Sequence, residues 1–454
     1  MNHDLSSVVG ALSGDLQSKY NLSSKYLVSK SRRLVSTNPI ASTASKRWVS
    51  SMVGNGIKVL WGNKKVQAAW DIWAKSPNAD GYGDLLAFQT LASKLLFEDG
   101  EAFIKFAYNG EVTKQNPLPL RLQIVDGSML ADSGSFTLSE NLYSIGGITF
   151  DYYMKPISYS FYKSNIFGLY STPIDVPASE VIHLFKKEYS GQVRGIPYLA
   201  PVMAIIDHLN ELFLATLERQ KSSQALSYIV RRQGADPFPF LGDNTRQETQ
   251  DLSALQERRF KQIQKIKAGS VAYLNLGEDI QVVSPQDIGD SLSKVFDGQL
   301  QQISASLDLT FEQLSNNLSE VNYSSARVGM LTANRLISQQ QQILLISVLL
   351  TKLTNKFLTL YSLEFGDRYK NTPVTFQVPK TDHVDREKEV RATILELQAG
   401  LTTLEIELAK RNLNYEDILT QLQKEHNIDI VLEGNKNSKS PKKVKTTNQK
   451  MVQA

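Results

Sequence analysis

The stretch Arg-Gly-Ile-Pro-Tyr-Leu-Ala-Pro at residues 194–201 separates two kinds of sequence in this chain. Before it, between residues 101 and 185, short runs with alternating apolar residues are typical of strands. After it, from Pro197 to Arg232, apolar residues recur about every 3.6 positions, which predicts a long helix. Strands followed by long helices favour an α+β fold.

The first part of the chain contains several short strand-like runs with turn residues between them. They fall at 101–106, 120–125, 148–153, 158–162 and 181–185. No helical crossover separates these runs, so mainly antiparallel pairing is expected. Helical patterns precede them, at 15–75 and 84–97. Within the first, Asn38-Pro39 marks a helix start and Gly54-Asn55-Gly56 a stop.

The second part of the chain is mainly helical. A mixed segment at 240–284 is predicted to hold a charged helix, at about 249–267, and two strands, 270–276 and 280–283. A helix from Pro285 to Asp308, a polar segment and the longest helix, Ala326 to Phe365, follow. The last predicted elements are a strand at 374–378 and helices near 385–399, 403–411 and 415–426.

Length and charge limit the possible classes of protein. With 454 residues, two or three domains are expected. The net charge is +4, but six lysines and no acid lie in residues 434–454, so the rest of the chain carries +4 − 6 = −2. The body is therefore not a basic protein that wraps phosphates tightly. The lysine-rich tail has no apolar periodicity and is predicted to be disordered.

Targeting segments and redox chemistry give expectations about location. The chain has no cysteine, which excludes disulfides and zinc–thiolate sites and fits a reducing cytoplasm. The N-terminus lacks the basic start and apolar stretch of a signal peptide. The most apolar run, Ile343 to Leu350, is shorter than the ~20 residues of a membrane span, so we expect no transmembrane segment.

A search for catalytic or metal-binding patterns finds none at a diagnostic spacing. The histidines are scattered: His3, His183, His208, His383 and His426. No GxxxxGK[ST] phosphate loop and no GxSxG elbow occur, and Ser324 or Ser325 beside Arg327 is better interpreted as a helix cap than as a nucleophile. We therefore expect a non-enzyme without catalytic, metal or cofactor-binding residues.

Acidic residues are concentrated between Pro285 and Ala326, where Lys294 is the single base. The acids are Asp287, Asp290, Asp297, Asp308, Glu312 and Glu320. At 100° per residue, Asp290 and Asp297 lie at about −60 and −80 degrees from Asp287, so the three share one helix face. Such a face is either simply solvated or, in a ring of subunits, a negative band on a channel wall.

The order of several motifs resembles the lambda-like portal family of tailed bacteriophages. The segments that carry the resemblance are Arg32-Arg33-Leu34, Asn38-Pro39, Met52 to Ile57, Trp70 with Trp73, Phe88 to Leu91, Asp99 to Ile104, Arg194 to Pro201, Asn322 to Arg327 and Asp385 to Glu389. Where the family usually has Asp-Pro, this chain has Asp385-Arg386, a change expected to alter only a helix start.

The resemblance implies a portal-type subunit with an α/β wing, long stem helices, a small clip and a helical crown. It implies a homo-oligomeric ring of about twelve subunits at one capsid vertex, through which double-stranded DNA passes weakly bound. It also implies docking to the terminase large subunit, to the major capsid or scaffold protein and to head-completion or tail proteins. The protein would be a virion component assembled in the host bacterial cytoplasm, without a membrane or a cofactor.

Mapping by order along the chain assigns the regions. The assignment is 1–196 wing, 197–232 first stem helix, 233–284 clip, 285–308 second stem helix, 309–325 tunnel loop, 326–383 long helix and return strand of the wing, 384–433 crown and 434–454 basic tail. On this assignment, the proposed channel lining comprises Asp287, Asp290, Asp297, Glu312, Asn316, Asn317, Glu320 and Tyr323. Acids with polar amides would keep DNA attachment weak.

Two other classes remain open on the residues alone. One is another capsid-associated adaptor, which a ring of subunits with a central channel would distinguish. The other is a phage-head enzyme, a nuclease or protease, fused to a structural domain; it would need paired carboxylates or a serine with a base in a cleft.

Overall fold

The structure is a computed structural model, and it describes most of the chain. The described residues are 25–108, 112, 117–131, 135–139, 142–164, 170–225, 229–232, 278–281, 289–317, 319, 323–379, 386–410 and 415–426. The chain divides into two compact units, one comprising Met1–Gly56 and Trp61–Val374 and the other Ile57–Leu60 and Thr375–Ala454. The lysine-rich tail at 434–454 and its expected disorder lie outside the described residues.

Helices begin the larger unit. A helix at 25–37 precedes α2 (Pro39–Val53), α3 (Lys64–Trp73) and α4 (Leu85–Asp99). The Asn38 side chain accepts hydrogen bonds from the backbone amides of Ile40 and Ala41, and Gly54 ends α2, which confirms the helix start and stop expected from the sequence. Trp70 and Trp73 are buried against Phe357, as core aromatic residues.

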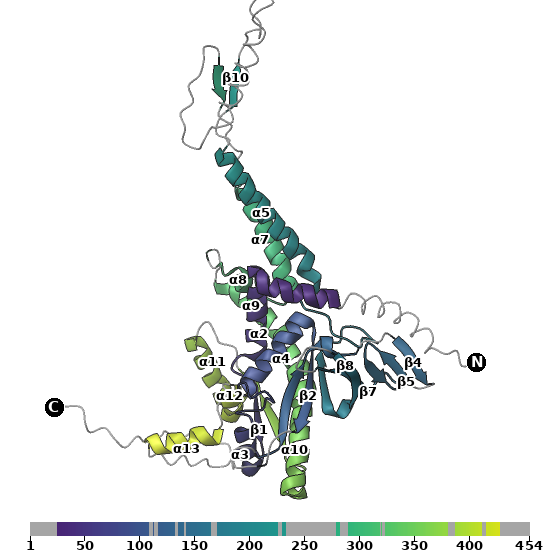
Figure 1. The fold of residues 1–454 in the computed structure, drawn as a ribbon. Coiled ribbons are helices and arrows are strands. Elements are labelled where there is room, and N and C mark those ends of the chain that lie inside the picture. The colour runs from purple at the N-terminus through teal and green to yellow at the C-terminus, as the bar shows by residue number, and fades with distance from the viewer. Residues whose placement is uncertain are drawn as a thin grey trace, which may run out of the picture. The chain divides into compact units, whose positions relative to one another are not determined.

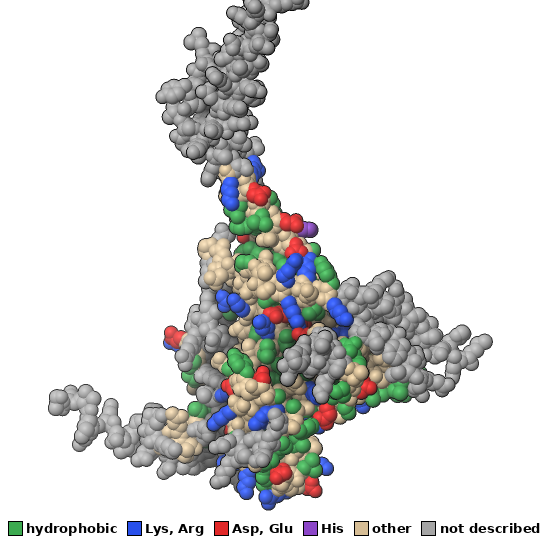
Figure 2. All heavy atoms as spheres, viewed as in Figure 1, with side chains coloured by type: hydrophobic (Ala, Val, Ile, Leu, Met, Phe, Trp, Pro, Cys, Tyr) green, Lys and Arg blue, Asp and Glu red, His purple; other side chains and the backbone are tan. Residues whose placement is uncertain are grey.

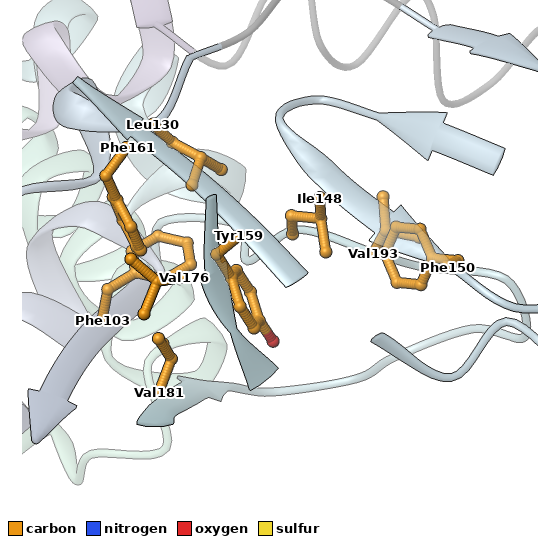
Figure 3. Close-up of a cluster of buried hydrophobic side chains, with 9 residues drawn as sticks. All are labelled: Phe103, Leu130, Ile148, Phe150, Tyr159, Phe161, Val176, Val181 and Val193. Carbon is orange, nitrogen blue, oxygen red and sulfur yellow. The ribbon is translucent and has the colours of Figure 1, made fainter. Parts of the chain in front are cut away.

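Two antiparallel sheets follow, which confirms the expected pairing. The first has the order β3 (Leu120–Val125), β2 (Glu101–Tyr108) and β9 (Val181–Phe185). The second runs β4 (Ser135–Ser139), β5 (Leu142–Ile145), β6 (Ile148–Phe150), β7 (Pro156–Ser164) and β8 (Tyr170–Pro177) in chain order. Figure 3 shows the apolar cluster that joins strands of both sheets: Phe103, Leu130, Ile148, Phe150, Tyr159, Phe161, Val176, Val181 and Val193. Mixed helix and antiparallel sheet make this an α+β fold.

Two long helices lie side by side beyond the sheets (Figure 1). They are α5 (Met203–Ala225) and α7 (Gly289–Ser306), and Phe213 of α5 meets Phe296 of α7 edge-on, with ring centroids 6.4 Å apart. Beyond them, β10 (Ile229–Arg232) pairs antiparallel with β11 (Glu278–Gln281). We call α5 and α7 the helical pair; Figure 2 shows acidic, basic and apolar side chains together on its visible face.

The helical pair corrects the expected boundaries. The sequence predicted one helix from Pro197 to Arg232, but α5 ends at Ala225 and Ile229–Arg232 is a strand. The β-branched Ile229 and Val230 suit a strand once β11 supplies backbone partners. The described part of the second helix runs from Gly289 to Ser306, and the expected start at Pro285 lies outside the described residues. The expected strand at 270–276 lies outside the described residues, and β11, at Glu278–Gln281, overlaps the described part of the strand expected at 280–283.

The longest helix is continuous but changes its geometry. It comprises α9 (Tyr323–Gln340), a π-helix, η4 (Gln341–Leu350), and α10 (Thr351–Phe365). The sequence predicted its end at Phe365 but started it three residues too late, at Ala326, and did not predict the π segment. The polar segment expected as a loop contains a short helix, α8 (Phe311–Ser315), because Thr310 and Gln313 form a reciprocal capping box.

The smaller unit holds the C-terminal helices. The edge strand β12 (Val374–Gln377) pairs with β1 (Lys58–Trp61), and α11 (Arg386–Gln398), α12 (Leu404–Lys410) and α13 (Tyr415–His426) follow. These elements agree with the strand and the three helices expected from the sequence to within two residues. The sequence predicted no membrane span. By length and composition alone, however, two helices of the structure, Ala200–Lys221 and Val328–Phe365, are long and apolar enough to cross a membrane.

That test is weak for the longer helix, because helices in the core of soluble proteins satisfy it as well. Apolar side chains of η4 and α10 are buried within the protein: Leu344, Leu345, Leu349, Leu350, Leu353 and Phe357. Burial of one face against other protein elements accounts for the high hydropathy of this helix.

Candidate channel residues and the base of the helical pair

The acidic positions on α7 lie beside its packed face. Counted from Asp297 at 100° per residue, Phe296, Leu300 and Ile303 fall between about −60 and −120 degrees, on the side that packs in the protein. Asp297 is half-buried at the edge of that face. Asp290 lies within about 20° of Asp297 around the helix axis, so the two acids share one stripe of α7. The side chain of Asp290 is not among those described, and Asp287 precedes the described part of α7.

A second group of candidate residues surrounds the short helix α8. Glu312 lies in the first turn of α8, half-buried, and its backbone carbonyl accepts a hydrogen bond from the amide of Asn316. Asn316 is exposed and left-handed, with φ 56°, so it ends the helix as Asn often does. The Asn317 side chain is also exposed and accepts hydrogen bonds from the amide and hydroxyl of Ser319.

The structure brings some of the candidates together and leaves others unplaced. Glu312, Asn316 and Asn317 lie within one short helix and its C-terminal turn, whereas Asp297 lies on α7. Tyr323 is the first residue of α9, but its side chain lies outside the described set, as does the whole of Glu320.

A hydrogen-bond node at the base of the helical pair was not predicted from the sequence. The Tyr198 hydroxyl, in the turn before α5, donates to Gln340 Oε1 over 2.7 Å. Gln340 Nε2 in turn donates to Asp308 Oδ2 over 2.9 Å. Asp308 follows the end of α7 and has a left-handed φ of 57°. The last residue of α9 therefore links the start of α5 to the end of α7, and the run of four glutamines at 339–342 was the available sequence signal.

The buried carboxylate of Glu101 is the centre of a second unpredicted cluster. Arg194 donates to Glu101 Oε1 from Nε over 2.8 Å and from Nη2 over 2.6 Å, and the Gly195 amide donates to Oε2 over 2.9 Å. His183 Nε2 lies 3.0 Å from Glu101 Oε2, and the imidazole stacks between Phe103 and Phe185. This cluster ties β2 and β9 to the segment that leads into α5.

Burial and charge set opposite protonation preferences within this cluster. Burial alone would raise the pKa of Glu101, but the Arg194 guanidinium and the hydrogen bond from His183 lower it to about 2. Burial lowers the pKa of His183, outweighing the attraction of the Glu101 carboxylate. At neutral pH the cluster therefore holds one anion, one guanidinium cation and a neutral imidazole with its proton on Nε2, facing the carboxylate.

The chain crosses itself closely beside this cluster. A Cβ atom on Gly195 would lie 2.1 Å from the carbonyl oxygen of Gly100, and one on Gly100 would lie 2.1 Å from the carbonyl carbon of Ile196. Gly100 also has φ +83°, a conformation that favours glycine. The Asp-Gly-Glu turn at 99–101 therefore packs backbone to backbone against the Arg-Gly-Ile segment at 194–196.

The groups of this cluster tie three segments of the chain together. Glu101 and His183 are buried, with side-chain exposures of 6% and 5%, and His183 borders a groove. A groove of about 570 Å³ lies between β6, β7 and the long helix, but its lining is mainly apolar, with Lys186, Lys187 and Lys352 beside it. Among the described residues, no three His, Asp or Glu side chains are grouped closely enough to hold a metal ion.

The fold thus consists of an α+β body, a helical pair with a two-stranded sheet, and a long helix at the base of the pair, all positioned by buried polar contacts. The chain belongs to the lambda family of phage portal proteins, because a model of that family, described as "Phage portal protein, lambda family", matches residues 9–341, most of the chain. Its function is that of a portal protein of a tailed phage, a structural family, which confirms the resemblance found in the sequence.

Curated portal proteins are similar to this chain at low identity. The portal protein of Escherichia phage N15 is 22% identical over 403 residues, a match that covers 80% of this chain and 73% of the N15 protein. Portal protein B of Escherichia phage lambda is 23% identical over 292 residues, covering 56% of this chain and 51% of the lambda protein.

Solved structures with similar chains are more distant. A chain in the virion of a native gene transfer agent particle has a TM-score of 0.49 and 13% identity, covering 85% of this chain and 93% of that one. An HK97-family phage portal protein from Corynebacterium diphtheriae has a TM-score of 0.34 and 9% identity, covering 77% of this chain and 94% of that one.

Proposed function

We propose that this chain assembles into a closed ring of about twelve subunits at one vertex of a tailed-phage capsid, and that double-stranded DNA passes through the centre of the ring during packaging and ejection. The observation that carries this proposal is the match of the portal family to residues 9–341, which includes the helical pair and the start of the long helix.

The observed elements suggest refined limits for the portal regions. The sheets and helices up to Val202 form the wing, α5 and α7 the stem, and residues 226–288, with β10 and β11, the clip. The tunnel loop spans 307–322 and includes α8, while α9, η4, α10 and β12 form the long helix and return strand of the wing. The crown comprises α11, α12 and α13, and the basic tail follows it.

The channel wall is proposed to be negative and polar. Asp287, Asp290 and Asp297 would give each subunit one acidic stripe on α7, and Glu312, Glu320, Asn316, Asn317 and Tyr323 would lie in or beside the loop nearest the DNA. Cations at these positions would bind phosphates cumulatively around the ring and hold the DNA. Acids repel phosphates, and amides bind them weakly, so DNA can slide.

The ring is proposed to act as a docking platform without catalytic activity or a cofactor. Its partners would be the terminase large subunit, the major capsid or scaffold protein, and head-completion or tail proteins. In the virion it would occupy the portal vertex, after assembly in the host cytoplasm. Hydrolysis of ATP for packaging would come from the terminase, because this chain has no phosphate-binding loop.

Mass measurement and a hydrolysis assay on the purified full-length chain test this proposal. We expect a ring of about twelve subunits at moderate protein concentration, with no ATPase activity and no metal-dependent DNA cleavage. A chain that stays monomeric at every salt and protein concentration would support the adaptor class instead. Robust hydrolysis that co-purifies with the protein would support the enzyme class.

A further inference from the structure

The π-helix η4 inserts extra backbone into the longest helix. In η4 the hydrogen bonds span five residues: the amide of Thr351 and its hydroxyl both donate to the carbonyl of Ile346. A ten-residue π segment is unusual, because π geometry mostly occurs as single-turn bulges. A helix that contains such a segment can return to α geometry by passing the surplus residue to the helix on either side.

Two glutamines fix the register of α9 at the edge of η4. Gln340 bridges Tyr198 and Asp308 through its side-chain amide. Gln341, the next residue, donates from Nε2 to the backbone carbonyls of Ser51, over 3.2 Å, and Met52, over 2.9 Å. Both side chains are buried, so each contact requires an amide at that place.

The following residue has the same side chain but no comparable contact. Gln342 is exposed, and its side chain makes no hydrogen bond to another described residue. If η4 passes one residue to α9, Gln341 takes the place of Gln340, and Gln342 takes the place of Gln341. Both buried amide sites are then filled again by glutamine, so the hydrogen bonds to Tyr198, Asp308 and the end of α2 can form in either register.

We propose that Gln340, Gln341 and Gln342 are positioning residues that hold α9 in either of two registers, which differ by one residue. The shift moves α9 about 1.5 Å along its axis and turns it by about 100°. The N-terminus of α9, at Tyr323, leads directly into the segment that contains α8. On the proposed portal function, which this step presupposes, the shift changes the surface that the loop presents to DNA.

The observed register is the more stable one. In α9, Ala333 and Ile337 are buried, whereas Thr332 and Ser338 are exposed. After the shift, Ser338 would take the buried place of Ile337, Asn334 would take the buried place of Ala333, and Ala333 would move to the exposed place of Thr332. The shifted register therefore replaces buried apolar side chains by polar ones and moves Arg335 to the half-buried place of Asn334, so it is the minor state.

Because the chain has no cysteine, a single thiol reports the shifted register. In the full-length Ala333→Cys protein, the thiol is buried in the observed register and exposed in the shifted one. Its rate of reaction with a soluble thiol reagent is then proportional to the population of the shifted register. Ser338→Leu should raise that rate about tenfold or more, because a leucine gains burial only after the shift.

Gln342→Met should lower the rate about tenfold, because the shifted register then lacks a donor for the carbonyls at the end of α2. The matched control is Gln339→Met, which occupies neither buried amide site in either register and should leave the rate unchanged. If Ser338→Leu and Gln342→Met both leave the rate unchanged, the thiol is exposed by local fraying and the two-register proposal is wrong.

The outcome is independent of the portal proposal. Thiol rates that change as expected in a protein that never forms rings would uphold the two registers and reject the proposed ring. Rings whose thiol rates respond to neither substitution would uphold the portal function and reject the two registers.

Discussion

The guanidinium of Arg194 forms an ion pair with the buried carboxylate of Glu101, 93 residues earlier in the sequence, with Nη2 2.6 Å from Oε1. Glu101 starts the central strand of the first sheet, and Arg194 lies in the segment that leads into α5. This pair therefore fixes the segment that leads into α5 against the first sheet.

Removing one partner of this pair should strongly destabilise the larger unit. We expect Arg194→Met to lower the free energy of unfolding by about 3–5 kcal/mol, because it leaves an uncompensated buried carboxylate. The control is Arg391→Met, which breaks the exposed Glu387–Arg391 pair on α11 and should cost about 0.5 kcal/mol or less. Chemical denaturation of both variants checks the difference, and equal losses would contradict a structural role for the Arg194–Glu101 pair.

The same cluster predicts how stability depends on pH. The folded-state pKa of Glu101 is lowered to about 2, so its contribution is present above its ordinary pKa of about 4.3 and is lost as pH falls from there towards 2. The folded-state pKa of His183 is also lowered, so its contribution is present above about 6.5 and declines as pH falls below it. Both effects make acid destabilising.

The histidine accounts for the part of that loss nearest neutral pH. In the unmutated chain, the denaturant concentration at the unfolding midpoint should decrease as the pH is lowered from about 6.5 to 5. His183→Gln should remove most of that decrease but keep the further decrease at lower pH. An unchanged slope in the variant would mean that His183 titrates alike in the folded and unfolded states.

The crossing of Gly100 and Gly195 gives a third prediction. Gly195→Ala forces a Cβ against the Gly100 carbonyl, so it should cost several kcal/mol and reduce soluble yield. Gly298→Ala, in α7, meets open space and should instead stabilise by about 0.5–1 kcal/mol, because alanine is the better helix former. Thermal unfolding of the two variants measures the contrast, and a neutral Gly195→Ala would show that the crossing is not tightly packed.

Charge reversal on α7 tests the proposed channel wall. Asp290→Lys with Asp297→Lys would place two added cations per subunit on one stripe of the helix. Rings should still assemble, but they should retain DNA more tightly at low salt, and packaging should be impaired. Rings of the double variant that package DNA at the normal rate, with an unchanged salt dependence, would place these acids away from the DNA.

Much of the fold could be predicted because local signals agreed with the final packing. Asn38 capped its helix, Gly54 ended α2, and the alternating strands paired antiparallel as expected. The predicted helix end at Arg232 was wrong, because Ile229–Arg232 forms a strand by pairing with Glu278–Gln281. Pairing between segments so far apart in the sequence cannot be inferred from local periodicity.

The candidate site was less predictable than the fold. Asp290 and Asp297 could be placed on one helix stripe from spacing alone, but which stripe faces a channel depends on neighbouring subunits. The Gln340 node and the Glu101 cluster join residues 32 to 142 positions apart, and such contacts arise from tertiary packing. The π geometry of η4 likewise reflects how α9 and α10 are both held by their surroundings.

A three-dimensional map of the purified full-length protein by electron microscopy tests the central claim most directly. The portal account predicts a closed ring of about twelve subunits, with α7 beside a central channel and the stripe of Asp290 and Asp297 facing the axis. A monomer, an open filament, or a ring whose α7 helices turn that stripe away from the axis would contradict it.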